Sequence, residues 1–204
     1  MRKTITLFAL TAFFLSVSTI ASAKIWRVNN NTGVAADFAT LSAAHAGAAD
    51  GDTLYLEGSP YDYGGATITK RLVILGTGYF LDEHPNSQAL VQSSKVETIT
   101  LYAGAAGTVI MGLDFRGNGI TVQSHDIVIR KNKFSNTGNG THDWTCGTVG
   151  LHTLNTNGNI PVNNIIISQN YGLKIDVNYA STGLLITNNY IAYQGASGEA
   201  TTSH

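Results

Sequence analysis

The sequence predicts an all-β protein: a right-handed parallel β-helix, which is a solenoid of stacked coils, with a short N-terminal capping helix. Two observations predict this fold. A short β-branched motif recurs at intervals close to one or two times 19 residues, and a Gly, Asn or Ser turn follows each copy. The composition, with 22 glycines and 3 prolines in 204 residues, favours strands and polar turns over long helices. Right-handedness follows from the general preference of parallel crossover connections.

Residues 1–23 have the pattern of a secretory signal peptide. Two basic residues precede the apolar run from Leu7 to Val17, and the Ala-Ser-Ala sequence that ends at residue 23 fits a cleavage site. We therefore expect Lys24 to begin the mature chain and the protein to be secreted or held at the cell surface. No later stretch reaches the roughly 20 apolar residues of a transmembrane helix, so we expect no membrane insertion.

The charge balance excludes some classes of partner. Without the two basic residues of the leader, the chain keeps 10 basic and 13 acidic residues. A net charge of this sign does not suit a nucleic-acid-binding surface or a polybasic membrane anchor. The single cysteine, Cys146, cannot form an internal disulfide, so packing of the 43% hydrophobic residues must hold the fold together.

The segment from Asp37 to His45 predicts a short helix at the start of the mature chain. Its apolar residues are at helical spacing, Asp37 is a suitable N-cap, and the pattern ends before Asp50-Gly51. Such a helix would cover the open end of the first coil, which a solenoid needs.

The repeat aligns apolar residues at one position of every unit. Successive isoleucines in the second half are separated by 19, 38 and 19 residues, and earlier runs lie 36 and 18 residues apart. A strand of three to five residues cannot bury its face alone, but strands stacked about 4.8 Å apart can. We therefore predict about five to seven coils around one internal column. The column consists of Leu56, Ile74, Ile110, Ile129, Ile167 and Ile186.

A second column holds asparagine. Asn132, Asn170 and Asn189 each lie three positions after the column isoleucine, where the first unit has Leu113. Periodic asparagines are interpreted either as a polar binding strip or as an internal ladder of hydrogen-bonded amides. Their register with the core favours the ladder.

The period doubles at two places. Between Phe134 and Ile165, one coil with a long inserted loop fits better than two plain coils, because the sequence around Cys146 breaks the expected apolar triplet. The other insertion runs from Leu81 to Lys95 and carries Asp82-Glu83-His84. Neighbouring residues rarely supply a full metal site, so we interpret this insertion as a solvated loop and predict no metal site.

The chain is thus expected to form one β-helix domain over residues 24–193, followed by a polar tail at 194–204. The tail has no pattern of a cap. Two alternatives remain open: something else covers the last coil, or the chain is cut short of its natural end.

Several motifs resemble secreted bacterial right-handed parallel β-helix proteins of the pectate-lyase-like superfamily. They are Phe38-x-Thr-Leu41, the run Gly51–Gly58, the run Ile68–Gly76 and the isoleucine–asparagine units. The resemblance covers roughly residues 25–193. It implies the β-helix fold, and it implies a range of roles, because the superfamily includes pectate lyases, polygalacturonase-type hydrolases and adhesins.

The catalytic residues of that superfamily have no counterparts here. A lyase-like site would need carboxylates on adjacent coils to bind Ca²⁺, with an Arg or Lys as base. The column of Asp114 instead continues as Lys133, Tyr171 and Tyr190. The stretch Arg130–Lys133 resembles only the basic part of a polygalacturonase-like site. We assign no catalytic residues and expect no cofactor, with Ca²⁺ needed only if the protein is lyase-like.

The long loop concentrates residue types that coil packing does not require. It contains His142, Asp143 and Trp144, and His152 follows shortly after. A tryptophan beside polar groups is typical of sugar recognition, because the ring gives a flat apolar face and the polar groups bind hydroxyls. We predict carbohydrate binding by these four residues. The alternative is that Trp144 plugs the loop against the coil and the histidines are solvated.

Two functional hypotheses follow. The first is a secreted or cell-surface module that binds polysaccharide or a cell-surface glycan, or acts as a spacer or adhesin, without an identifiable catalytic site. The second is a polysaccharide lyase or glycoside hydrolase that acts on an acidic polysaccharide such as pectin. The missing stacked carboxylates favour the first. The sequence gives no prediction of the oligomeric state.

Overall fold

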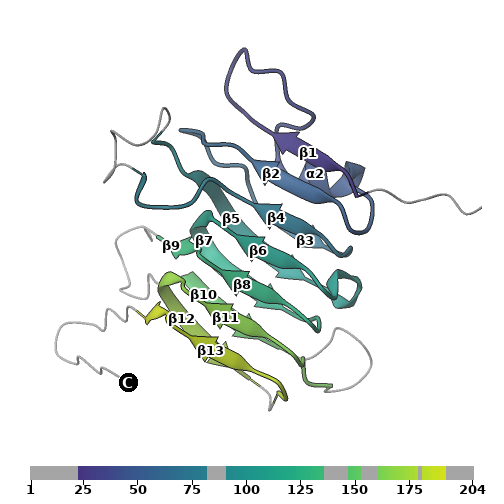
Figure 1. Cartoon of the computed structure of the whole chain (residues 1–204), viewed down its shortest axis with the longest axis vertical. Helices are drawn as coiled ribbons and strands as arrows, with labels where there is room; N and C mark the ends of the chain where they lie inside the picture. The colour runs from purple at the N-terminus through teal and green to yellow at the C-terminus, as the bar shows by residue number, and fades with distance from the viewer. Residues whose placement is uncertain (1–22, 82–90, 136–146, 153–159, 179–180, 192–204) are drawn as a thin grey trace, which may run out of the picture.

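The protein consists of two parallel β-sheets (Figure 1), as seen in a computed structural model that describes residues 23–81, 91–135, 147–152, 160–178 and 181–191. Sheet A is seven-stranded, and its strands neighbour one another in chain order. They are β1 (Ile25–Val28), β2 (Thr53–Leu56), β4 (Val73–Leu75), β6 (Val109–Met111), β8 (Val128–Arg130), β11 (Ile166–Ser168) and β13 (Leu185–Thr187).

Sheet B is also seven-stranded, and from β2 onward the chain passes alternately between the two sheets, with β9 and β10 together forming one passage through sheet B. Its strands are β3 (Ala66–Ile68), β5 (Ser94–Leu101), β7 (Leu113–Val122), β9 (Lys133–Phe134), β10 (Gly147–Leu151), β12 (Tyr171–Val177) and β14 (Tyr190–Ile191). A short 3-10 helix, η3 (Ala103–Ala105), follows β5. Each passage through a strand of sheet A and then of sheet B is called a unit below.

Both doubled intervals are single units. Strand β4 pairs directly with β6, and β8 pairs directly with β11, so no additional strand of sheet A lies between them. Within the longer interval, β9 and β10 both pair with β7 on one side and with β12 on the other. These two strands therefore share one place in sheet B, and the inserted loop interrupts that place. The prediction of one unit with a long loop is confirmed.

The predicted internal column is confirmed for its five isoleucines, but the prediction is wrong for its first member, Leu56. Ile74 pairs with Leu54, whereas Leu56 pairs with Val28. Both leucines are fully buried in the same short strand, two residues apart, so both face the interior and alternation alone cannot tell which one continues the column. Leu54 is the residue in register with the isoleucines that follow.

The asparagine column forms the internal ladder. The Oδ1 atom of Asn132 accepts a hydrogen bond from the Leu113 amide at 3.0 Å, and its Nδ2 donates to the Ile110 carbonyl at 3.1 Å. The Asn132 amide donates to Asn170 Oδ1, and the Asn170 amide donates to Asn189 Oδ1, each at 3.0 Å. These side chains therefore satisfy the backbone where the chain turns from sheet A to sheet B.

The capping helix is present, but its N-cap differs from the prediction. Helix α2 (Leu41–Gly47) is capped by Thr40, whose Oγ1 accepts from the Ala43 amide at 3.2 Å. Asp37 instead accepts from the Arg27 amide at 2.8 Å, which ties the preceding loop to β1. Leu41 is fully buried against the first strands, so α2 covers this end of the core as expected.

Within the described residues, no helix has the length and apolar character that crossing a membrane requires. The expected signal peptide, residues 1–23, lies outside the described part of the chain except for Ala23.

Candidate functional site

Three of the four residues predicted to bind carbohydrate lie outside the described residues: His142, Asp143 and Trp144. The same holds for Asp82, Glu83 and His84 in the other insertion. His152 is described; it follows β10, and its Nδ1 lies 3.2 Å from Asn178 Nδ2. His152 is therefore held by a neighbouring unit, and the prediction for the loop itself stays a prediction.

A different site is present at the edge where sheet A turns into sheet B. In three successive units, the residue before the ladder asparagine is exposed and has a positive φ. The values are 54° for Lys131, 57° for Gln169 and 54° for Asn188. This left-handed turn directs the backbone around the buried asparagine. It places the three polar side chains in one line along the stack.

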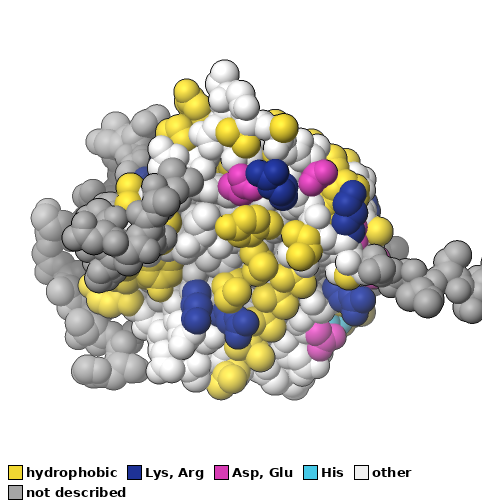
Figure 2. Space-filling model, turned by 45° about the horizontal axis from the view of Figure 1, so that its top comes forward, with side chains coloured by type: hydrophobic (Ala, Val, Ile, Leu, Met, Phe, Trp, Pro, Cys, Tyr) yellow, Lys and Arg dark blue, Asp and Glu magenta, His cyan; other side chains and the backbone are white. Residues whose placement is uncertain are grey.

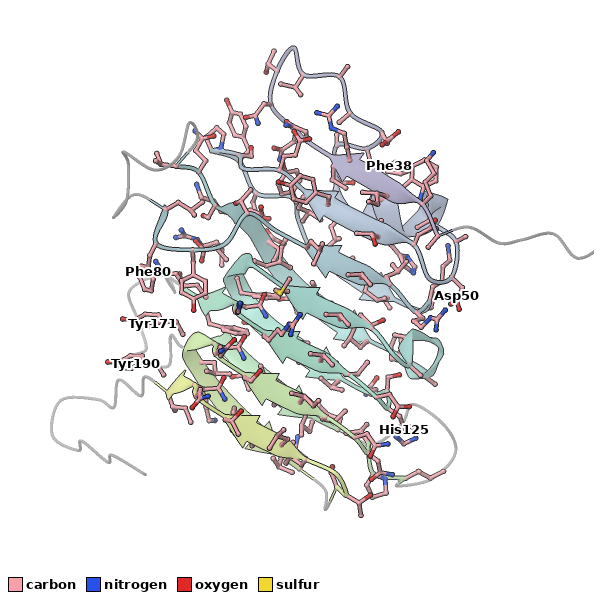
Figure 3. All side chains as sticks on the ribbon, viewed as in Figure 1. Phe38, Asp50, Phe80, His125, Tyr171 and Tyr190 are labelled. Carbon is pink, nitrogen blue, oxygen red and sulfur yellow. The ribbon has the colours of Figure 1, made fainter. Side chains whose placement is uncertain are left out.

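A second line of residues lies one position after each asparagine and includes two aromatic residues. It consists of Lys133, Tyr171 and Tyr190, which are neighbours in register on sheet B. The rings of Tyr171 and Tyr190 stack with centroids 4.6 Å apart and planes 10° apart. Figure 3 shows Phe80, Tyr171 and Tyr190 one below another along one edge of the molecule, with Asp50 and His125 at the opposite edge.

The segment that follows β4 completes the site, although it lies about 90 residues earlier in the sequence. Phe80 contacts the Tyr171 ring edge-to-face at 4.8 Å, and Lys133 Nζ lies 4.7 Å from the Phe80 ring centre. The Tyr79 hydroxyl donates a hydrogen bond to the Gln169 carbonyl at 3.1 Å. Burial raises the pKa of Tyr79, so this hydroxyl stays protonated and remains a donor.

One glycine explains why this segment can approach the turn. Gly112 has a φ of 77° and occupies the position that Lys131 occupies in the next unit. Its carbonyl accepts from the Gly78 amide at 2.9 Å. A Cβ atom at Gly112 would lie 2.7 Å from the Gly76 carbonyl oxygen, which is too close. The absence of a side chain at this position brings the segment 76–80 against the turn.

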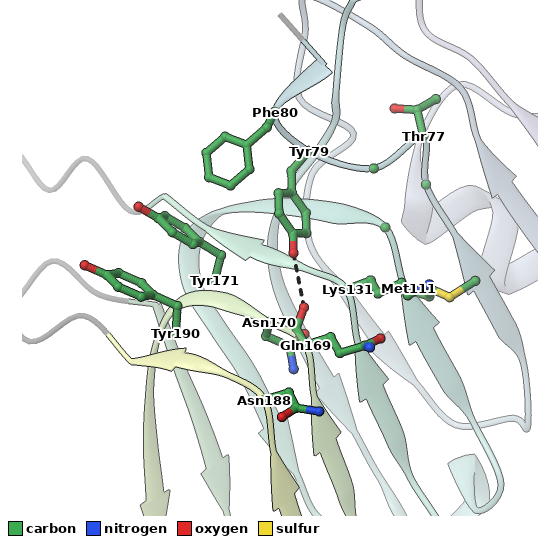
Figure 4. A pocket seen from close by; sticks show the side chains of 13 residues that line it. Thr77, Tyr79, Phe80, Met111, Lys131, Gln169, Asn170, Tyr171, Asn188 and Tyr190 are labelled. Atoms are coloured by element: carbon green, nitrogen blue, oxygen red, sulfur yellow. Dashed lines mark hydrogen bonds between the residues drawn. The ribbon is translucent and has the colours of Figure 1, made fainter. Parts of the chain in front are cut away.

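Together these residues line a groove of about 760 Å³ (Figure 4). Its aromatic part consists of Tyr79, Phe80, Tyr171 and Tyr190, and its polar part of Thr77, Lys131, Gln169, Asn170 and Asn188. Lys131 is the one charged side chain among the described lining residues. Exposed side chains on its rim leave the groove accessible to solvent, and its volume lies within the range of known ligand sites.

Figure 2 shows hydrophobic side chains gathered in a band across one face of the molecule, with Lys and Arg side chains at its margins.

The buried carboxylate of Asp114 is paired with a basic side chain of the same strand. Asp114 lies in register between Lys95 and Lys133, and its Oδ2 pairs with Arg116 Nη2 at 2.6 Å. The next residues in its column are Tyr171 and Tyr190, so the carboxylates do not stack in the described units, as the sequence predicts. In the described part of the chain, no group of three or more His, Cys, Asp or Glu residues is placed to hold a metal ion.

The sequence contained part of the signal for this site. The column from Asp114 through Tyr190 is visible in the repeat alignment, and two of its four residues are tyrosines. Tyr79 and Phe80 carry no such signal, because their partners belong to units far along the chain.

Comparison with protein-family models, with curated proteins and with solved structures finds no match for this chain.

Proposed function

We propose that this protein is a secreted or cell-surface carbohydrate-binding protein that binds glycan in the groove formed by Tyr79, Phe80, Tyr171 and Tyr190. We further infer that its two sheets are faces of a right-handed parallel β-helix, and that the groove runs along one corner of that helix.

The strand order supports the inferred architecture. From β2 onward the chain alternates between two parallel sheets, and the strands of sheet A lie side by side in chain order. The units from β4 to β11 also repeat a buried isoleucine in register, and the last three described units repeat the turn into a ladder asparagine. Right-handed crossovers are the rule for parallel strands. With the motifs that resemble the pectate-lyase-like superfamily, these features favour a β-helix.

The pairing of an aromatic line with a polar line carries the functional proposal. A sugar ring has apolar C–H faces and a rim of hydroxyl groups, so it needs aromatic surface and hydrogen-bonding side chains together. The tyrosine rings supply the first, and Lys131, Gln169 and Asn188 supply the second. Because strands repeat about 4.8 Å apart, these partners recur along the stack, which suits a polymer better than a single small molecule.

The inserted loop is compatible with this proposal. It begins directly after β9, and β9 contains Lys133, which lies in register with Tyr171. His142, Asp143 and Trp144 are proposed to extend the binding surface from this side. The four-residue site predicted from sequence is thus kept as a peripheral part, and the groove becomes the centre.

We do not extend the proposal to an enzyme. A glycoside hydrolase needs a pair of carboxyl groups at the scissile bond, and a lyase-like site needs carboxylates for Ca²⁺. The described residues that line the groove include neither Asp nor Glu. No observation favours the lyase or hydrolase hypothesis over binding.

The test is binding to a panel of neutral and acidic polysaccharides, measured by affinity electrophoresis and then by calorimetry on any ligand found. We expect Tyr171→Ala to weaken binding about tenfold or more, because a half-buried aromatic anchor of the groove is lost. Tyr102→Ala is the matched control: Tyr102 is also half-buried, but it lies at the other end of the sheet B strands. Thermal unfolding of each variant checks its fold. Failure of every polysaccharide to bind, or equal weakening by both substitutions, would overturn the proposal.

A further inference from the structure

We propose that Asp52 binds the α-amino group that cleavage of the signal peptide creates at Lys24. The sequence predicts removal of the leader after Ala23, which converts the backbone amide of Lys24 into a free ammonium group. In the folded chain, a buried carboxylate lies at hydrogen-bond distance from that nitrogen. The site requires the expected cleavage, and it is independent of the proposed glycan groove.

The carboxylate of Asp52 is held in place by three donors. Asp52 directly precedes β2 and is 3% exposed. Its Oδ1 atom accepts a hydrogen bond from the Lys24 backbone nitrogen at 2.8 Å. Its Oδ2 atom accepts from Trp26 Nε1 at 2.7 Å and from the Ala49 amide at 2.8 Å. Of these three donors, only the Lys24 nitrogen gains a charge when the preceding peptide bond is cleaved.

The main chain on the other side of Lys24 positions this nitrogen. The Lys24 carbonyl accepts a hydrogen bond from the Thr53 amide at 2.8 Å, and β1 begins at the next residue, in register with β2. Ala23, which precedes the predicted cleavage site, is exposed. Cleavage between Ala23 and Lys24 therefore removes no residue of the strand and leaves the nitrogen beside Asp52.

Asp52 lacks a cationic partner in the uncleaved chain. In the described part of the chain, no Lys, Arg or His side chain lies within ion-pair distance of its carboxylate. The side chain of Lys24 is placed elsewhere, because its Nζ lies over the Trp26 ring, 3.2 Å from the ring centre. Buried carboxylates are usually paired with a cation. The α-ammonium group supplies this charge at Oδ1, the oxygen that Trp26 and Ala49 do not use.

The other titratable groups on the adjoining elements have different partners. They are His45, Asp50, Lys70 and Arg71, with Arg27 and Glu57 toward the far ends of the first two strands. Lys70 Nζ donates to carbonyls at the end of α2, the nearest at 2.7 Å, and His45 accepts from a backbone amide at 3.1 Å. The Arg71 amide donates to Asp50 at 2.9 Å. All of these groups are present with or without the leader, so a difference between the cleaved and the uncleaved chain isolates the α-amino group.

An α-amino group bound in this way gives the chain a pH dependence at alkaline pH. A carboxylate beside an amine favours its charged form, which raises the pKa of the α-amino group above its ordinary value of about 8. The unfolded chain then loses this proton at a lower pH than the folded chain. The stabilisation by the ion pair is complete below that ordinary value and is lost as the pH rises through the raised pKa.

The experiment compares two chains that differ by one residue: one begins at Lys24, the other at Ala23, and each is released from a fusion partner. In the longer chain, the Lys24 nitrogen is again a neutral amide. We expect the shorter chain to have a melting temperature about 2–4 °C higher at pH 7, as a charge-assisted hydrogen bond gives in a chain of this length. This difference should disappear as the pH rises through the pKa of the α-amino group, which NMR titration of the shorter chain measures.

Two substitutions identify the carboxylate that is responsible. Asp52→Asn removes the charge but keeps an acceptor, and it should abolish the difference between the two chains. Asp50→Asn is the matched control, because Asp50 lies two residues away and bonds to the Arg71 amide, and it should leave the difference unchanged. Equal melting temperatures of the two wild-type chains, or a difference that persists in Asp52→Asn, would overturn the proposal.

The NMR titration needs no variant, so it decides the matter if Asp52→Asn does not fold. A raised pKa of the α-amino group supports the proposal, and an ordinary pKa contradicts it. Mass spectrometry of the protein exported from cells that express the full-length chain identifies its first residue, and a first residue other than Lys24 also contradicts it. Polysaccharide binding is a separate measurement, so this site and the proposed function fail independently.

Discussion

The two ends of the stack are built from the same repeat but are closed differently. At the first end, α2 buries Leu41 and Ala44 against the strands, and Asp52 accepts hydrogen bonds from the Lys24 and Ala49 amides and from Trp26 Nε1. In β13, the last described strand of sheet A, Leu185 and Ile186 remain exposed. The repeat alone therefore does not bury the apolar residues of a unit, and at the first end α2, which lies outside the repeat, supplies the missing contacts.

Electrostatics reinforce the difference. Burial tends to raise the pKa of Asp52, but the three hydrogen bonds that it accepts outweigh burial and lower its pKa. The hydrogen bond from Arg27, at 2.6 Å, lowers the pKa of Glu57 in the same way. The first end is thus held by charged and hydrogen-bonded groups, while the last unit has none of these charges.

The largest expected effect is on core packing at the two ends. Leu41→Ala should lower the free energy of unfolding by about 2–5 kcal/mol, because it leaves a cavity under α2. Ile186→Ala should cost less than half as much, because this side chain is already 41% exposed to solvent. Urea unfolding of both variants measures the difference. Equal losses would mean that the last unit is as well covered as the first.

Much of the fold, but little of the site, could be predicted from sequence. The isoleucine and asparagine columns repeat with the strand stack, so periodicity reveals them directly. The prediction of Asp37 as the N-cap is wrong because Asp37 and Thr40 are both good capping residues. Asp37 is engaged instead in a tertiary hydrogen bond from the Arg27 amide, which the local sequence does not reveal.

The groove shows most clearly what the sequence does not predict. Tyr171 and Tyr190 form a column in the repeat alignment, but the contact of Phe80 with Tyr171 joins segments that have no periodic relation. The residue type of Trp144 indicates sugar recognition, but residue type does not predict where the ring lies.

The asparagine ladder allows a second comparison, between its buried member Asn132 and its last described member Asn189. Asn132 is fully buried and bonded on both sides, so Asn132→Ala should cost about 1–3 kcal/mol through orphaned backbone groups. Asn189 ends the described ladder and donates to the Ile167 carbonyl, and its loss should cost less because water can reach this end. Denaturant midpoints of the two variants test the order. A larger loss at Asn189 would contradict a ladder that weakens toward the open end.

A smaller effect is expected at the helix cap. Thr40→Ala removes the acceptor for the Ala43 amide and should cost about 1 kcal/mol. Asp37→Ala provides the comparison, and it should affect the loop before α2 rather than the helix itself, because Asp37 bonds to Arg27. Hydrogen exchange of the α2 amides distinguishes the two variants. Faster exchange of the α2 amides in Asp37→Ala than in Thr40→Ala would restore Asp37 as the cap.

The smallest effect is a pH dependence at the capped end. His45 Nε2 accepts a hydrogen bond from the Thr69 amide at 3.1 Å, and burial, followed by the charge of Lys70, lowers the pKa of His45 below 6.5. The unfolded chain therefore binds a proton more readily than the folded chain. The contribution of neutral His45 to the free energy of unfolding is complete above pH 6.5, and it is lost as the pH falls through the lowered pKa of His45.

Thermal unfolding between pH 7 and 5 should show this loss, and His45→Gln should reduce it. Asp52 and Glu57 have lowered pKa values and stay ionised in this range, so their contributions change only at more acidic pH. An unchanged pH dependence in His45→Gln would exclude this histidine as the cause.

The most direct test of the proposed glycan site compares substitutions of two tyrosines in different parts of the molecule. Tyr190 in the groove and Tyr61 near the capped end are 57% and 59% exposed, so they differ in place rather than in exposure. Calorimetric titration with the glycan identified in the panel should show binding weakened about tenfold or more in Tyr190→Ala and unchanged in Tyr61→Ala. Equal affinity of the two variants would contradict a glycan site in the groove.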